Sequence, residues 1–340
     1  MGRLSTLEEL SSIIGIPINQ IRRVAEDIER HCRTLYLVDK DNIEKKPREI
    51  SAPTHPLRKL QNAIHRKILL PRIVRCPNSH GGVRGKNTVS CVSAHKGKKF
   101  YYSGDIRSFY PSIHFERVRN LFLKLGCSET VAAVLTRLCT NNNRLEQGFI
   151  TSPILADRIF LQADNRIIRL CEKARLTYSR FVDDITISSP YDLQQSGIPN
   201  TIAKILADCD FSINPDKNEF GNLRKGAVIL GLRIKNRRVD IPTEYFEETV
   251  NRLVMMRDLG NGVYLNVTRY YTQDELLGRI QYICSVSPKQ GAELLSIWRT
   301  LRWNDIRKTA EQRELVMREK RRIICTDLSE LQALLRESGD

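Results

Sequence analysis

The segment YSRFVDDITISSP, residues 178–190, constrains the fold of this chain more than any other stretch. Asp183 and Asp184 stand side by side between two short runs in which apolar residues alternate with hydroxyl-bearing ones. Such alternation predicts β-strands, in which aspartate is disfavoured. The pair therefore marks either an ordinary turn between two strands or a place where metal ions are held.

A third aspartate favours the metal interpretation. Asp105 closes the segment FYYSGD, residues 100–105, which also predicts a strand. Carboxylates at the ends of neighbouring strands can converge, and hard cations such as Mg²⁺ prefer oxygen ligands. Two such ions about 3.5–4 Å apart can activate a 3′-hydroxyl and stabilise a leaving pyrophosphate. The three aspartates thus indicate a site for nucleotidyl transfer with two Mg²⁺ ions.

The charge of the chain points to a polyanionic partner. The sequence has 340 residues, of which 41% are hydrophobic, enough for a sizeable core and two or three subdomains. The formal net charge is +16, and residues 41–100 hold 14 Lys and Arg against three Asp and Glu. This local excess favours phosphate backbones and triphosphates, with a solvated basic face as the ordinary alternative.

Cysteine usage and hydropathy predict a cytoplasmic protein. The nine cysteines show no C-x-x-C pair, which suggests free thiols in a reducing compartment and argues against a zinc site. No apolar run approaches the roughly 20 residues of a membrane span. The N-terminus MGRLST fits a loose myristoylation pattern, but Ser5 and Glu8 also form a capping box, and we favour that helix start.

Periodicity predicts an α+β body followed by a helical tail. We expect two helices within 5–35, broken at Gly15–Pro17, and further helices at 57–70, 114–143, 153–175 and 198–209. Expected strands are 35–38, 48–53, the segment from 98, the two runs around Asp183, and AVILGLRI at 227–234. From Thr243 onward the chain is expected to be mostly helical.

These blocks resemble, in order, the motifs of retron-type bacterial reverse transcriptases, from about Arg48 to Trp298. Arg48-Glu-Ile with Pro53, and HGGVRGKN (80–87), are similar to the two fingers motifs. DIRSFYPSI, QGFITSPILAD, FVDD, NPDK and VILGLRI are similar to motifs A to E, and residues 275–298 to the thumb. The resemblance implies a right-hand polymerase with an antiparallel palm sheet. It divides the chain into an N-terminal helical extension (1–34), fingers and palm (35–240), and a helical thumb and tail (241–340).

The resemblance also implies roles for individual residues. Asp105 and Asp183 would hold the two metal ions, with Asp184 beside them and the backbone oxygen of Ile106 completing a shell. Lys217 would protonate the leaving pyrophosphate, although a solvated turn lysine is the ordinary reading. The residues expected at the deoxynucleotide are Arg48 on the triphosphate, Tyr110 against a 2′-hydroxyl with Phe109 packed beside it, and Gln147 and Gly148 at the base and template.

Nucleic-acid contacts are expected from Arg84 and Lys86, and from three positions where family signatures are altered. Phe181 replaces the usual tyrosine of motif C, which bears on primer contact. His95 is what remains of N-A-x-x-H, and Gly231 of V-T-G, two signatures linked to recognition of a partner RNA. In addition, Asp157 stands where motif B usually has asparagine. Basic thumb positions expected along a duplex are Arg252, Arg257, Arg269, Arg279 and Lys289.

We therefore expect an RNA-directed DNA polymerase that uses Mg²⁺ and dNTPs to copy a partner non-coding RNA into DNA, in bacterial antiviral defence. A separate effector or second polymerase chain would be another partner. One alternative is the same fold making DNA by a protein-primed or template-independent route. The alternative of another class is a catalytically idle RNA-binding scaffold, which the three aspartates argue against. The sequence leaves the priming group, the product and the oligomeric state open.

Overall fold

A computed structural model of the chain describes residues 3–37, 47–263, 267, 269–312 and 324–325. Contacts divide the chain into two compact units, one of Met1–Leu35 with Glu49–Lys225 and the other of Tyr36–Arg48 with Gly226–Asp340. Two strands, β1 (Cys32–Leu37) and β2 (Arg48–Pro53), carry the chain across this boundary. The mixture of helices and antiparallel strands is the expected α+β class.

The first unit is mostly helical. Its longer helices are α1 (Leu7–Ile14), α2 (Ile18–Glu26), α3 (His55–Ile64), α6 (Phe115–Lys124), α7 (Glu129–Cys139), α8 (Ser152–Lys173) and α9 (Ile198–Ala207). Short elements are η1 (Glu29–His31), the π-helical turn η2 (His65–Leu69), α4 (Leu70–Arg72), α5 (Thr88–Ser93), η3 (Pro215–Lys217) and η4 (Leu223–Lys225). Pro153 lies in the first turn of α8, where its missing N–H costs no helical hydrogen bond.

The N-terminal helices belong to the core of this unit. Gly15, at φ 70°, ends α1, and Pro17 caps α2, so the chain breaks where the sequence predicted. Leu10 and Ile21 are fully buried in one apolar cluster that also contains Phe160 of α8. The capping box uses Thr6 and Glu9, one residue later than predicted, because the Thr6 side chain accepts the Glu9 N–H.

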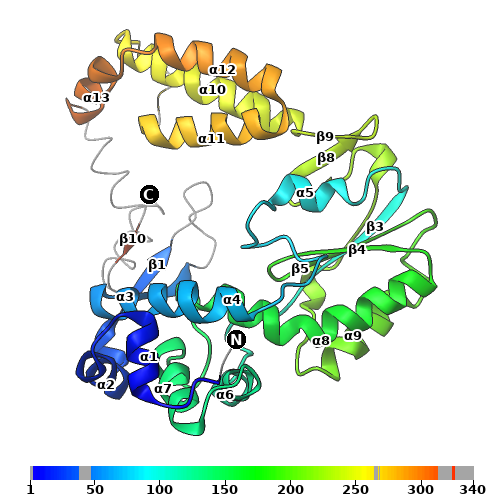
Figure 1. Cartoon of the computed structure of the whole chain (residues 1–340). Helices are drawn as coiled ribbons and strands as arrows, with labels where there is room; N and C mark the ends of the chain where they lie inside the picture. The colour runs from blue at the N-terminus through cyan, green and yellow to red at the C-terminus, as the bar shows by residue number, and fades with distance from the viewer. Residues whose placement is uncertain (1–2, 38–46, 264–266, 268, 313–323, 326–340) are drawn as a thin grey trace. The chain divides into compact units, whose positions relative to one another are not determined.

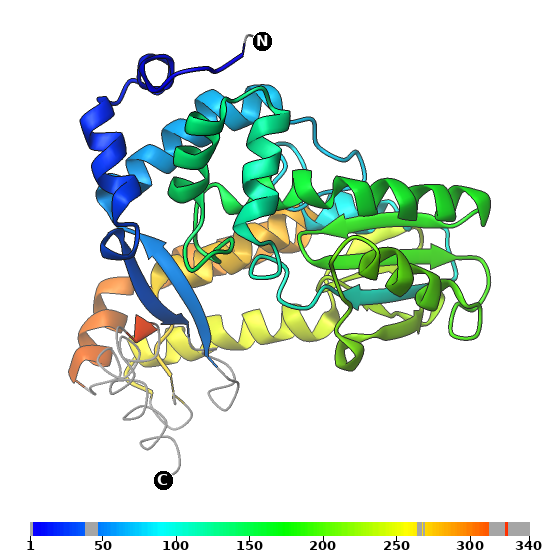
Figure 2. The same ribbon diagram turned by 90° about the horizontal axis from the view of Figure 1, so that it is seen from below.

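A four-stranded antiparallel sheet lies at the centre of the candidate site, in the order β4-β5-β3-β6. The strands are β3 (Phe100–Asp105), β4 (Thr177–Phe181), β5 (Asp184–Ser189) and β6 (Glu219–Asn222). Figure 1 shows α8 and α9 on one side of this sheet and α5 on the other. The second view, in Figure 2, again places α8 and α9 alongside the strands.

Side-chain alternation along β4 explains why helices cover both faces. Tyr178 and Arg180 point to one face, where both hydrogen-bond Asp164 of α8. Ser179, between them, points to the other face and contacts His95, which follows α5. Because successive strand residues face opposite sides, β4 joins the two layers through adjacent residues.

The second unit contains a small sheet and a set of helices. Its elements are β7 (Val228–Ile229), β8 (Leu232–Lys235), β9 (Arg238–Asp240), α10 (Thr243–Gly260), α11 (Gln273–Val286), α12 (Pro288–Thr300), α13 (Trp303–Gln312) and β10 (Ile324–Cys325). β10 pairs with the end of β1 through Tyr36 and Leu37. α10, α11 and α12 lie side by side (Figures 1 and 2).

The expected single strand at 227–234 is wrong. Leu230 and Gly231 have φ values of 50° and 74°, and Ile229 pairs with Leu232 across them. Two positive φ values between paired residues are the pattern of a tight type I′ hairpin turn, so β7 and β8 are separate strands. The helical tail is also interrupted at β10, and its remaining residues beyond 312 lie outside the described part. Among the described helices, none is both long enough and apolar enough to cross a membrane.

Candidate active site

The two adjacent aspartates lie at the tip of a β-hairpin. Phe181 of β4 pairs with Asp184 of β5, which leaves Val182 and Asp183 as a two-residue turn. Val182 has φ 60°, whereas Asp183 is not among the residues with positive φ. This is the pattern of a type II′ turn, whose first central position normally needs glycine. A β-branched residue there stores strain of about 1–3 kcal/mol, a feature that concentrates at functional sites.

The register of the sheet brings the third aspartate to the same place. Asp105, the last residue of β3, pairs directly with Asp184. The backbone N–H of Ile106 donates to the carbonyl of Asp183 at 3.0 Å, which joins the end of β3 to the hairpin turn. The carbonyl oxygen of Ile106 is not the acceptor in this bond. Asp105 thus lies next to Asp183 and Asp184 in the sheet, although 78 residues of sequence separate Asp105 from Asp183.

Asp184 is a carboxylate on which burial and neighbouring charges act strongly. Burial, followed by the charges of Asp183 and Asp105, raises the pKa of Asp184 from 3.8 to about 6, and Lys217 opposes the rise. A carboxyl with a raised pKa is costly to ionise unless a cation stands nearby. The geometry therefore favours a bound cation at this edge of the sheet.

Lys217 lies within this cluster. Its Nζ is 2.9 Å from Oδ2 of Asp105, although 59% of the lysine side chain is exposed. The turn that carries it, η3, is fixed by one backbone hydrogen bond and one side-chain hydrogen bond of Asn214. The Asn214 N–H donates to the carbonyl of Asp105 at 2.8 Å, and the Asn214 side chain accepts the N–H of Asp216. Lys217 is therefore paired with one of the three aspartates rather than alone in solvent.

The three aspartates carry oxygen ligands suited to metal ions, but their carboxylates do not converge on one point. Within the described residues, no group of three or more His, Cys, Asp or Glu side chains converges on a single metal position. The pairing of Asp105 with Lys217 explains this arrangement, because one carboxylate is turned to the ammonium. The donor set still fits Mg²⁺, because it consists of oxygens and is negatively charged, and a bound cation would favour ionisation of Asp184, whose pKa is raised to about 6.

Tyr110 borders the carboxylates, and Phe109 lies beneath it. The Tyr110 ring is partly buried, and burial followed by the charge of Asp183 raises the pKa of its hydroxyl to about 12. Phe109 is 4% exposed, and its ring centroid is 5.4 Å from Tyr110 and 5.6 Å from Phe160. Phe109 therefore supports Tyr110 from the core, and its burial leaves little surface for direct contact with a nucleotide.

Gly148 is required by a close approach between two backbone segments. Its φ is 109°, and an added Cβ would lie 2.4 Å from Cγ2 of Ile50 and 2.7 Å from the carbonyl oxygen of Ser51. Ser51 also donates its N–H to the carbonyl of Gln147 at 2.9 Å. The side chain of Gln147 is exposed. The Gln147–Gly148 pair thus docks on β2 and presents an amide to solvent just before α8.

His95 is a structural residue, and the expected contact with nucleic acid is not supported. The side chain is fully buried, with Nδ1 2.7 Å from the Ser188 hydroxyl and Nε2 2.7 Å from that of Ser179. Burial lowers the pKa of His95 to about 3, so the imidazole is neutral. Both ring nitrogens are occupied in tying the segment after α5 to β4 and β5.

The remaining predicted contacts fall in different surroundings. Arg84 is exposed in the glycine-rich loop, whereas the Lys86 ammonium donates to the carbonyls of Pro77 and, at 3.0 Å, Ser79. Arg48 is exposed at the start of β2 and belongs to the second unit. Gly231 belongs to the same unit and lies in the β7–β8 turn. Phe181 is partly buried at the hairpin. Lys86 therefore braces its own loop, and Arg84 has the more accessible guanidinium.

Three of the arginines predicted to lie along a duplex instead make contacts within the second unit. Arg252 is 4% exposed and pairs with Glu248, and Arg279 pairs with the same carboxylate at 2.9 Å. The Arg279 guanidinium also stacks 4.1 Å from the centroid of Tyr245. Arg269, 9% exposed, pairs with Glu275 at 3.4 Å. The Arg279–Glu248 pair joins α11 to α10, and Arg269 ties the segment before α11 to that helix, while Arg257 and Lys289 are exposed.

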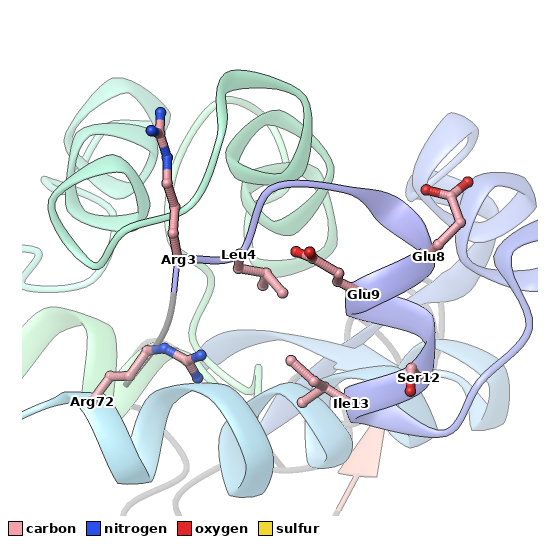
Figure 3. A pocket seen from close by; sticks show the side chains of 7 residues that line it. All are labelled: Arg3, Leu4, Glu8, Glu9, Ser12, Ile13 and Arg72. Carbon is pink, nitrogen blue, oxygen red and sulfur yellow. The ribbon is translucent and has the colours of Figure 1, made fainter.

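Two hollows in the first unit lie apart from the carboxylates. Figure 3 shows the larger, about 500 Å³, bordered by α1 and by Arg72 at the end of α4. It is lined by Arg3, Leu4, Glu8, Glu9, Ser12, Ile13 and Arg72. The other, about 430 Å³, lies beside η3 and α9 and includes Tyr102, Arg107 and Phe211. Neither hollow is lined by any of the three aspartates.

Comparisons with known proteins give matches to reverse transcriptases. The family model described as reverse transcriptase (RNA-dependent DNA polymerase) matches residues 38–234, more than half of the chain. The retron Ec86 and Ec48 reverse transcriptases of Escherichia coli are each 28% identical to it, over 72% and 71% of this chain. The retron Se72 reverse transcriptase of Salmonella heidelberg is 30% identical over 68% of it. The matches cover 76%, 62% and 62% of those three proteins, respectively.

A solved structure also matches at low similarity. Telomerase from Candida albicans, in complex with a fragment of telomeric RNA, matches 82% of this chain and 58% of its own at 12% identity. The TM-score is 0.44, too low to establish a common fold by itself.

Proposed function

The chain belongs to the reverse transcriptase (RNA-dependent DNA polymerase) family, and from this membership we propose that it copies a partner non-coding RNA into DNA. The observation that carries the proposal is the register of β3 and β5, which pairs Asp105 with Asp184 beside the Val182–Asp183 turn. The relatives named as retron reverse transcriptases favour a retron-type RNA as template. A role in defence against phage is part of the same proposal.

Asp105, Asp183 and Asp184, with the Ile106 carbonyl, would hold two Mg²⁺ ions, which lower the pKa of a primer 3′-hydroxyl and neutralise the triphosphate. In the reaction, the 3′-oxygen bonds to the α-phosphorus and the bond to the pyrophosphate oxygen breaks. Lys217 would give its proton to that leaving oxygen, a role supported by its position in the cluster, where its Nζ lies 2.9 Å from Asp105.

We assign substrate selection to Tyr110, Gln147, Arg48 and Arg84. Tyr110, supported from below by Phe109, would exclude a 2′-hydroxyl and so favour deoxynucleotides. Gln147 presents an exposed amide that can hydrogen-bond a base or sugar. Arg48 and Arg84 carry exposed guanidiniums suited to phosphate oxygens.

The test uses the purified protein with the nucleic acid that copurifies with it. Labelled dNTPs and Mg²⁺ are added with and without RNase pre-treatment, and the product is sequenced. A product that RNase abolishes and that is complementary to one bound RNA supports templated synthesis. A low-complexity product that survives RNase moves the answer to template-independent synthesis.

A catalytic control separates polymerase from scaffold. Asp183→Ala should abolish incorporation and leave RNA binding intact, because the carboxylate serves the reaction and not the RNA. If the wild type also binds RNA but incorporates no nucleotide with any dNTP or divalent cation tested, the RNA-binding scaffold is favoured instead.

A further inference from the structure

A buried ionic network lies directly behind the catalytic hairpin. Arg180 of β4 is 1% exposed. Its Nε and one terminal nitrogen reach both oxygens of Asp164 at 3.0 and 2.8 Å. That terminal nitrogen also lies 2.7 Å from Oδ1 of Asp157, and the guanidinium stacks 4.6 Å from the Phe160 centroid. An arginine this deep is tolerated only when its donors and its charge are satisfied.

The charges of the network balance. Asp157 and Asp164, both on α8, face Arg180 and a second guanidinium, that of Arg75, which pairs with the other oxygen of Asp157. Ser79 and Tyr178 add hydroxyl donors, Ser79 to Asp157 and Tyr178 to Asp164. Two carboxylates therefore meet two guanidiniums. This balance explains why position 157 carries aspartate where related motifs have asparagine.

One end of the network holds the hairpin turn. The second terminal nitrogen of Arg180 donates to the carbonyl of Val182 at 2.7 Å. Val182 is the residue with φ 60°, and Asp183 follows it directly. A charge-assisted bond to this carbonyl opposes relaxation of the strained turn.

The other end holds the glycine-rich loop. Arg75 donates to the carbonyls of Gly81 and Gly82 at 3.2 and 3.4 Å. An added Cβ on Gly81 would lie 2.4 Å from Cγ2 of Val182 and 2.6 Å from its backbone nitrogen. The loop and the turn are therefore in direct contact, and one network binds both.

We propose that the Arg75–Asp157–Arg180–Asp164 network is a positioning device that fixes the Val182–Asp183 turn against the glycine-rich loop. These four are positioning residues, since they act through the turn and not on the nucleotide. The device keeps the Asp183 carboxylate beside Asp105 and Asp184 despite their repulsion. Its consequence for metal binding rests on the proposed function, whereas its effect on the turn does not.

The first test measures the turn itself. Asp157→Asn keeps the shape of the side chain but leaves two guanidiniums against one carboxylate. Amide hydrogen exchange across residues 181–184 of the metal-free protein should become at least about tenfold faster. Arg75→Gln combined with Asp157→Asn restores charge balance near Arg180 and should recover part of the protection. The control is Arg166→Gln. Arg166 is also on α8, but it forms an ion pair with Asp208 near the surface, so its replacement should leave amide exchange at 181–184 unchanged.

The second test measures the consequence for the site. The Mg²⁺ concentration for half-maximal incorporation should rise by about 10- to 100-fold in Asp157→Asn, the usual effect of losing a residue that orients metal ligands. Affinity for RNA should not change. A variant that merely lowers the melting temperature, with unchanged exchange at 181–184 and an unchanged Mg²⁺ midpoint, overturns the proposal. If exchange is altered in Asp157→Asn but the wild-type protein itself makes no DNA, the positioning device is supported and the polymerase assignment is rejected.

Discussion

Replacing Asp184 by asparagine should stabilise the metal-free protein at neutral pH while abolishing nucleotide incorporation. Burial and the neighbouring charges of Asp183 and Asp105 raise the pKa of Asp184 from 3.8 to about 6. The folded state therefore resists ionisation of this carboxyl. Asparagine keeps its size and removes the charge, so the substitution removes the cost.

The sign and size of this stability difference follow from the linkage between proton binding and folding. A group whose pKa is higher in the folded chain contributes stability that is complete below about pH 3.8 and is lost as the pH rises through about 6. A shift of about two units corresponds to about 3 kcal/mol, at roughly 1.36 kcal/mol per unit. The advantage of Asp184→Asn over wild type should therefore grow from about 0.5 kcal/mol at pH 4 to about 3 kcal/mol at pH 7.

Urea unfolding in EDTA, from pH 4 to pH 8, measures this difference. Asp192→Asn, at an exposed aspartate after β5, serves as the control and should show no such growth with pH. Added Mg²⁺ should narrow the gap at pH 7, because cations that bind the native carboxylates stabilise the wild type. A pH-independent difference, or a variant less stable than wild type at pH 7, would refute the claim that burial and the neighbouring carboxylates raise the pKa of Asp184.

Three further substitutions test individual residues. Gly148→Ala should destabilise the protein by about 2–5 kcal/mol in denaturant unfolding, from the clash with β2 and the φ of 109°. Gly278→Ala, with open space around its Cβ in α11, should be neutral or slightly stabilising; equal effects would contradict the Gly148 argument. His95→Ala should cost about 2–4 kcal/mol, since it leaves a cavity and removes the hydrogen bonds to the buried Ser179 and Ser188 hydroxyls, with RNA affinity unchanged in a filter-binding assay. Weaker RNA binding by folded His95→Ala would restore the contact we reject. Tyr110→Ala should raise ribonucleotide use by on the order of 10- to 100-fold in single-turnover incorporation, and unchanged sugar selectivity would reduce Tyr110 to a core residue.

Local patterns predicted much of the fold. The alternation around Asp183 gives the β4–β5 hairpin because strand period and turn position are both encoded in neighbouring residues. The break at Gly15–Pro17 and the start of α8 at Ser152–Pro153 follow from glycine and proline, whose backbone preferences are strong. AVILGLRI was misread because a tight hairpin with apolar arms looks like one apolar run when a single glycine marks the turn.

The support of the site could not be predicted in the same way. His95 meets Ser179 and Ser188 across 84 and 93 residues of sequence, and Arg75 meets Asp157 across 82. No local period reports such pairs, because their partners are set by how the layers pack. The available signal was a charged residue in an element that becomes buried: Arg180 lies within a buried strand, and Asp157 lies on the buried face of a helix. A buried charge demands an opposite partner, which sequence alone cannot name.

The candidate site gathers features that each oppose folding. Val182 is strained, like-charged aspartates are neighbours, and a guanidinium is buried behind them. Without a constraint, the turn would relax and the carboxylates would separate, which is the lower-energy arrangement in the absence of a cation. The bond from Arg180 to the Val182 carbonyl and the missing Cβ of Gly81 oppose that relaxation. A cation bound among the carboxylates would offset their repulsion, so a turn held rigid in advance and a repulsive cluster would together favour metal binding more than either would alone.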